Sequence, residues 1–261
     1  MEKHISFGNG YKTSYQSKLD TIKGVGFDGV FFIFECDRNF YEANQYAQKI
    51  GLKIDSMHLP YLATNDIWRE GEDGDYFTDR LIAGIHYAGS MGIKNAVAHV
   101  SSSPTPPMHN DLGLKRLEKV VEVAQKRNVR FCLENTRRND YLDWVFANFK
   151  DADSLGFCFD FGHTNAFTHD TTDPRWLPYL DKLTCVHMHD NDGTGDQHLL
   201  PFDGNLNWQY LMPTVFKTRR DVPLTLEFTD IARTLHPYWT EKHFLAEAID
   251  RLSVLEHLID K

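Results

Sequence analysis

The sequence predicts an α/β fold, a single (β/α)8 TIM barrel that takes up residues 1–261 as one domain. Three observations favour this fold. The chain has 261 residues, and such a barrel typically needs about 250. Short apolar runs alternate with longer amphipathic runs, which predicts a parallel sheet. Eight apolar runs in 261 residues give roughly 33 residues each, the size of one strand–helix unit.

The eight predicted strands are runs enriched in Val, Ile, Phe and Cys and bounded by Gly or Pro. They cover residues 5–7, 29–34, 52–58, 95–99, 130–135, 156–160, 183–189 and 223–228. No GxGxxG motif follows the first of them, which argues against an open dinucleotide-binding sheet.

Helical patterns follow most of these strands. They cover residues 18–23, 40–50, 76–91, 112–126, 141–149, 208–217 and 241–259. Within the fourth pattern, Leu117, Val120, Val121 and Ala124 form one apolar stripe at helical spacing. Long irregular stretches at 60–74, 101–110 and 191–207 each follow a strand, so we expect them on the face of the barrel that carries catalytic chemistry.

Composition excludes several classes of protein. The apolar content of 41% is enough to fill a core and excludes disorder. The net charge of −9 argues against nucleic acid as a partner. No signal peptide opens the sequence, and no apolar run is long enough to span a membrane. We therefore expect a cytoplasmic protein with no membrane partner and with its four cysteines reduced.

Potential metal ligands stand at or near the ends of six consecutive predicted strands. They are His58, His99, Glu134, Asp160, His189 and Glu227. Strand ends of one barrel converge on one rim, so these side chains are expected to lie together. A single acid or histidine at a strand end is more often a structural group, but six in register are not expected by chance.

Residues two positions before these ligands share their face of each strand. Cys132, Cys158 and Cys185 then become interior residues of neighbouring strands, without redox chemistry. His187 is expected one layer beneath His189, in a structural role.

The Gly-rich stretch after the seventh strand carries Asp196 and His198. We expect both to fold back over the rim as substrate contacts or ligands, while Asn207 caps the next helix. Arg137 and Arg138 are expected to be solvated, with recognition of an anion as the alternative. Four aromatic residues of these loops are candidates for stacking on a sugar or for packing: Tyr61, Trp68, Trp176 and Phe202.

Seven motifs carry a resemblance to a known family. They are GFDGV (26–30), HLPY (58–61), CLEN (132–135), FDFGH (159–163), HMHD (187–190), DQHLLPFDGNLNW (196–208) and LEF (226–228). With them the chain resembles the xylose isomerase-like barrel superfamily, which includes sugar isomerases, epimerases and endonuclease IV-type AP endonucleases. Where related barrels often read PGEG, this chain reads PFDG at 201–204.

The resemblance to the epimerase branch implies one divalent metal held by Glu134, Asp160, His189 and Glu227, with His163 on the substrate. This donor set suits Mn(II) or Zn(II), with Co(II) or Mg(II) possible. The resemblance to the endonuclease branch implies three zinc ions, and every ligand position of that branch has a candidate here. The additional candidates are His58, His99, His163, Asp196 and His198.

The expected activity is a metal-dependent sugar isomerase or epimerase that transfers a proton through an enediolate, with Glu134 and Glu227 as the catalytic acid and base. His163, His58, His99, Asp196 and His198 are expected to contact the carbohydrate substrate. Alternatives are a zinc-dependent AP endonuclease-like phosphodiesterase, a sugar lyase or dehydratase, and a non-catalytic carbohydrate-binding barrel.

Acidic residues crowd two loops of the expected active face, which disfavours a phosphate backbone as ligand. They are Asp66, Glu70, Glu72, Asp73, Asp75, Asp190, Asp192 and Asp196. We therefore expect a small neutral sugar, and the sequence leaves open whether the protein forms a homo-oligomer.

Overall fold

The computed structural model describes residues 1–172 and 174–260 and contains an eight-stranded parallel sheet. The strands are β1 (Lys3–Ser6), β2 (Gly29–Ile33), β3 (Ser56–His58), β4 (Asn95–Ala98), β5 (Arg130–Glu134), β6 (Leu155–Asp160), β7 (Leu183–His187) and β8 (Leu224–Leu226). Their order is β7-β6-β5-β4-β3-β2-β1-β8. A parallel bridge between Met188 and Leu226 joins the two end strands, so the sheet closes into the predicted (β/α)8 barrel.

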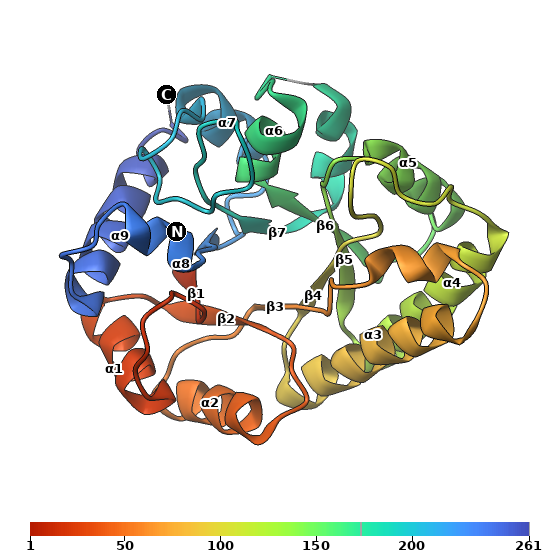
Figure 1. The fold of residues 1–261 in the computed structure, drawn as a ribbon, viewed down its shortest axis with the longest axis horizontal. Coiled ribbons are helices and arrows are strands. Elements are labelled where there is room, and N and C mark those ends of the chain that lie inside the picture. The colour runs from red at the N-terminus through yellow and green to blue at the C-terminus, as the bar shows by residue number, and fades with distance from the viewer. Residues whose placement is uncertain (173, 261) are drawn as a thin grey trace.

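Helices surround the strands as an outer ring (Figure 1). They are α1 (Tyr15–Val25), α2 (Arg38–Lys49), α3 (Glu72–Met91), α4 (Asp111–Arg127), α5 (Asn139–Asn148), α6 (Phe161–Thr168), α7 (Trp208–Val215), α8 (Asp230–Thr234) and α9 (Glu241–Glu256), with 3-10 turns η1 (Thr64–Trp68) and η2 (Pro174–Lys182). None of the helices that the structure describes is long and apolar enough to cross a membrane.

Apolar faces and caps explain where these helices form. The stripe predicted on α4 is buried along its whole length. The Asn110 side chain accepts a hydrogen bond from the Gly113 N–H at the start of α4, and Asn207 does the same for Tyr210 at the start of α7. These caps satisfy amide groups that lack a partner within the helix, and the predicted role of Asn207 is confirmed.

The bounds of several elements differ from the prediction. The third strand, expected over residues 52–58, is confined to Ser56–His58, because Lys53 makes only an isolated bridge to Gly29. Helix α6 and the short helix α8 were not predicted. Helix α6 begins directly after β6 because the Asp160 carboxylate accepts the His163 N–H at 2.7 Å and caps it.

The barrel interior beneath the rim is lined as predicted by Cys132, Cys158 and Cys185. Together with Val97 they form a buried apolar cluster, and all three thiols are free. Burial raises the pKa of each thiol well above its ordinary range. They are therefore protonated packing groups near neutral pH, as small buried cysteines commonly are.

Candidate active site

The carboxyl ends of the strands deliver acids and histidines to one pocket of about 560 Å³. His58, Glu134 and Asp160 are the last residues of β3, β5 and β6, and His99 follows β4 directly. The predicted site residues that line the pocket are His58, His99, Glu134, His163, Asp196, His198 and Glu227. Of the six residues predicted at strand ends, Asp160 and His189 do not line the pocket and are fully buried.

Glu134 lies at the centre of the cluster and is fully buried. Its Oε2 is 3.3 Å from His58 Nε2 and 3.0 Å from His99 Nε2. Its Oε1 is 3.2 Å from His187 Nδ1. His163 Nδ1 is 3.6 Å from the same Oε1, so one carboxylate faces four imidazoles.

The structure brings together Glu134, Asp160, His187 and Glu227, whose potential ligand atoms lie within 4.8 Å of one another. We call these four residues the tetrad. The fourth member is His187, the last residue of β7, which pairs in register with Asp160 at the end of β6. His189, the ligand expected from the sequence, lies beyond the strand, with its Nε2 3.1 Å from Asp160 Oδ1.

Two buried atoms of the tetrad lack a hydrogen-bond partner among the described residues, Asp160 Oδ2 and His187 Nε2. Because unpaired buried polar atoms are costly, such atoms call for an explanation, and a bound ion is one. Three carboxylates and one imidazole are a donor set that divalent cations such as Mn(II) and Zn(II) accept. The tetrad therefore fits a divalent metal.

Asn135 fixes the position of Asp160 and was not predicted as a site residue. Its Oδ1 accepts the Asp160 N–H at 2.7 Å, and its Nδ2 donates to the Asp160 carbonyl at 2.9 Å. Its own carbonyl lies 2.7 Å from His163 Nδ1. The CLEN motif thus supplies both a tetrad carboxylate and the amide that orients its neighbours.

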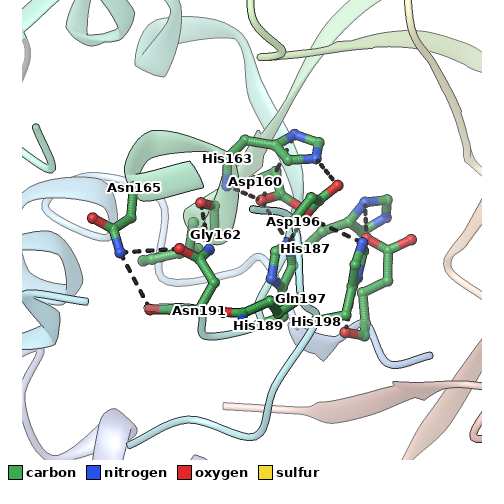
Figure 2. A network of polar contacts seen from close by, with 12 residues as sticks. Asp160, Gly162, His163, Asn165, His187, His189, Asn191, Asp196, Gln197 and His198 are labelled. Carbon is green, nitrogen blue, oxygen red and sulfur yellow. Dashed lines mark hydrogen bonds and ion pairs between the residues drawn. The ribbon is translucent and has the colours of Figure 1, made fainter. Parts of the chain in front are cut away.

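A second group of ligand atoms surrounds Asp196 (Figure 2). Asp196 Oδ2 is 3.4 Å from His163 Nε2, and Asp196 Oδ1 is 3.4 Å from both His189 Nε2 and His198 Nε2. His189 Nε2 is also 3.1 Å from Asp160 Oδ1. The loop after β7 therefore does fold back over the rim, and His189 lies between Asp160 of the tetrad and Asp196 of this second group.

Asp190 anchors that loop. Its carboxylate accepts hydrogen bonds from the N–H groups of Asn191, Leu206 and Phe202 and from Trp208 Nε1, at 2.8–3.1 Å. Asp203, in the PFDG variation of the family motif, pairs with Arg251 at 2.6 Å and with His236 at 2.6 Å. Both acids thus hold the loop in place.

The active face carries less unpaired negative charge than the sequence suggested. Asp190 is buried and fully hydrogen-bonded, Asp66 pairs with Arg69 at 2.6 Å, and Asp75 pairs with Arg116 at 2.9 Å. Internal pairing of this kind reduces the charge that a ligand meets.

Of the four aromatic candidates, Trp68 and Trp176 are buried packing residues. Tyr61 lines the pocket. Phe202 is exposed and does not line it. Arg137 lies over the Phe167 ring, 3.9 Å from its centre, outside the residues that line the pocket.

The charges of the cluster shift its pKa values strongly. Burial alone would raise the pKa of Glu134, but the imidazoles of His187 and His99 hold it well below its usual range. Burial would lower the pKa of His187, but the carboxylates of Glu227 and Glu134 raise it to about 10. The same balance acts on His198. Burial would lower its pKa, but the carboxylates of Asp196 and Glu227 raise it to about 9.

These shifts predict that metal affinity rises with pH. The imidazole of His187, with its pKa near 10, carries a proton at pH 7, and a metal ligand must be neutral. Binding therefore releases at least one proton, and the affinity should rise by up to about tenfold per pH unit between pH 6.5 and 8.5. Calorimetry in buffers of different ionisation enthalpy measures the release. An affinity that does not change over this range would contradict the prediction.

Gly162 is expected to be intolerant of a side chain. A Cβ at this position would lie 1.9 Å from His189 Cε1, so Gly162→Ala must displace the His189 ring. Such overpacking should lower the free energy of unfolding by about 1–3 kcal/mol, measured by urea denaturation. Gly195→Ala is the control, because its Cβ would meet nothing within 4 Å. Equal stability of the two variants would contradict the placement of His189.

Comparison of the sequence with known families identifies the same TIM-barrel fold that the structure shows. The family described as xylose isomerase-like TIM barrel matches residues 19–250. Among curated proteins, y4fM of Sinorhizobium fredii, itself uncharacterized, is 29% identical over 164 residues, which cover 55% of this chain and 50% of that protein. The chain spans about half the length of the curated relatives it matches.

Solved structures with this architecture include a sugar epimerase. A D-psicose 3-epimerase from Clostridium cellulolyticum H10, determined with D-tagatose, is 14% identical with a TM-score of 0.74 over 99% of both chains. The TTHB071 protein of Thermus thermophilus, soaked with ZnCl2, is 20% identical with a TM-score of 0.70 over 98% of this chain and 96% of that one. At these identities the likeness shows the fold.

Proposed function

Because the chain belongs to the xylose isomerase-like TIM barrel family and carries the tetrad, two of whose carboxylates, Glu134 and Glu227, line the pocket, we propose that it is a divalent-metal-dependent sugar isomerase or epimerase. The observation that carries the proposal is the tetrad itself, with two buried ligand atoms left without a partner among the described residues. Sugar epimerases among the similar structures support the same class of reaction.

The tetrad residues Glu134, Asp160, His187 and Glu227 would hold the metal, with Mn(II) or Zn(II) as the expected ions. A divalent cation in this position supplies Lewis acidity, which polarises a sugar carbonyl and acidifies the neighbouring C–H bond. His189, which the sequence had placed among the ligands, is assigned to the second group around Asp196.

Glu227 and Glu134 are the proposed acid and base. Glu227 follows β8 and Glu134 ends β5, so they reach the pocket from different strands. Glu227 is partly exposed in the pocket and lies 3.4 Å from the His187 imidazole. One carboxylate removes the proton next to the carbonyl and the other returns it, which is general acid–base catalysis.

The pocket histidines are proposed to orient the sugar hydroxyls. His58 and His99 lie within 3.3 Å of Glu134, and His163 and His198 lie 3.4 Å from Asp196. Imidazole nitrogens can donate or accept hydrogen bonds, as recognition of a polyol requires.

Hydrogen exchange with solvent tests the proposal. Metal-loaded protein is incubated in D2O with a panel of ketoses and aldoses, and the products are analysed by NMR and mass spectrometry. The proposal expects deuterium at the carbon next to the carbonyl, and only with metal present. Turnover of a sugar without deuterium incorporation would overturn the proton-transfer mechanism.

A zinc-dependent phosphodiesterase is a second candidate, favoured by one observation. Two further ligand groups adjoin the tetrad: His58 and His99 with Glu134, and His189 and His198 with Asp196. Several metals in one site suit phosphodiester hydrolysis. Cleavage of an abasic-site oligonucleotide by protein that holds three zinc ions per chain would favour this candidate over the epimerase.

A further inference from the structure

Two lysines line the same pocket as the metal-ligand cluster. Lys12 lies in the loop between β1 and α1, and Lys18 lies in α1. They are the only Lys or Arg side chains among the described residues that line this pocket. Neither belongs to the tetrad or to the group around Asp196, so the proposed reaction leaves both without a role.

Lys18 is unusual because most of its side chain is buried while its ammonium has no ionic partner. Its exposed fraction is 7%. Among residues 1–172 and 174–260, no hydrogen bond or ion pair is made by its ammonium, which lies over the face of Phe7, with Nζ 5.1 Å from the ring centre. Phe7 lines the pocket too. Nζ is the accessible tip of this otherwise buried side chain in the pocket, so an anion bound there would gain a charge-assisted hydrogen bond.

The nearby carboxylate of Glu241 does not fill that role. It attracts Lys18 electrostatically, but its Oε1 accepts from Asn9 Nδ2 at 3.1 Å and its Oε2 from Thr13 Oγ1 at 3.0 Å. Burial lowers the pKa of Lys18, and Glu241 only partly opposes this. The ammonium is therefore available for a stronger acceptor on its pocket side.

The loop that carries Lys12 also suits the approach of a ligand. Gly8 and Gly10 line the pocket on either side of Asn9, and Gly10 has φ of +76°, a conformation that glycine adopts without strain. Glycine leaves the backbone open to close contact with a ligand group. The cationic and glycine-rich residues thus come from the β1–α1 segment, whereas the metal ligands come from β3 to β8.

We propose that Lys18, assisted by Lys12, forms an anion subsite of this pocket, so that the sugar bound there carries a phosphate or a carboxylate group. The metal ligands would hold the carbonyl end of such a sugar and the lysines its anionic end. The inference names the substrate class and in that respect rests on the proposed function; the subsite itself rests on the burial and pocket position of Lys18. It replaces the expectation of a neutral sugar.

Calorimetry on metal-loaded protein tests the subsite without need of turnover. The ligand pairs are D-ribulose against D-ribulose 5-phosphate, and D-glucose against D-glucuronate. A charge-assisted contact should favour one anionic member over its neutral partner by about 10–100-fold. Preference for the phosphate or for the carboxylate identifies the group. Anionic ligands that bind no tighter than neutral ones would overturn the proposal.

Variants of Lys18 test whether this residue, and not the metal, causes the preference for anionic over neutral sugars. Lys18→Met should abolish most of the preference, while Lys18→Arg should keep it. Lys49→Met is the matched control, since Lys49 is an exposed lysine in the last turn of α2. An undiminished preference in Lys18→Met would overturn the proposal. Should Lys18→Met fail to fold, Lys18→Gln carries the test, because glutamine removes the charge and keeps a polar end; an undiminished preference in Lys18→Gln would overturn the subsite.

The failure of the subsite and the failure of the proposed function are distinguishable. If no sugar exchanges hydrogen with solvent but Lys18-dependent anion binding is present, the isomerase proposal fails and the subsite remains. If neutral sugars exchange hydrogen equally well in wild type and Lys18→Met, and the two proteins bind anionic sugars equally, the isomerase remains and the subsite fails.

Discussion

Glu227→Gln should lower the rate of solvent hydrogen exchange by about 10²–10⁴-fold, the usual contribution of a general acid or base. Glutamine keeps the shape of the side chain and its ability to accept a hydrogen bond, but it cannot take up a proton. Glu227 is suited to proton transfer because it is the tetrad carboxylate that remains partly exposed in the pocket. The measurement is the initial rate of deuterium incorporation into the sugar.

Two controls accompany this variant. Metal content is determined first, because Glu227 also belongs to the tetrad and metal loss alone would lower the rate. Glu118→Gln removes one exposed carboxylate from α4 and should leave the rate unchanged. A metal-loaded Glu227→Gln protein with the wild-type rate would exclude Glu227 as acid or base. Retained sugar binding without any turnover in the wild type would instead indicate a carbohydrate-binding barrel.

His187→Asn should cost more metal affinity than His189→Asn. Loss of a residue that only supports a ligand typically costs about 10–100-fold in affinity, and loss of the His187 ligand itself should exceed this. The reason is geometric: His187 contacts two tetrad acids, Glu134 at 3.2 Å and Glu227 at 3.4 Å. His189 contacts one tetrad acid, Asp160, and its other acid is Asp196.

Metal content after dialysis, measured by mass spectrometry against a series of chelator concentrations, checks this order. The two variants are a matched pair, since both replace a fully buried histidine of the same segment by the same residue. Loss of metal from His189→Asn with full retention by His187→Asn would restore the ligand set expected from the sequence.

Much of this site was predictable from the order of residues. Six consecutive strands were predicted to end at or near a residue that can bind a metal, and a closed barrel brings such strand ends together. Glu134, Asp160 and Glu227 lie together as this pattern indicates. His187 was expected in a structural role beneath His189. Its place in the tetrad follows because β7 ends at His187, in register with Asp160, and this register could have been found by aligning the last residues of neighbouring strands.

Other features depend on contacts between distant segments. Lys18 lies in a helix whose sequence shows an ordinary polar residue, and its burial against Phe7 follows only from the packing of the β1–α1 loop. The charge of the acidic loops was overestimated for the same reason. The partner of Asp75 is Arg116, 41 positions away, and the sequence gives no signal for such a pair.

The proposed reaction depends on a divalent metal held by Glu134, Asp160, His187 and Glu227. Anomalous diffraction from crystals grown with Mn(II) or Zn(II), recorded at the absorption edge of the ion, locates that metal. We expect a peak within about 2.0–2.3 Å of ligand atoms from all four residues. A peak coordinated by His189 in place of His187, or no peak at the tetrad in metal-saturated crystals, would contradict this ligand set.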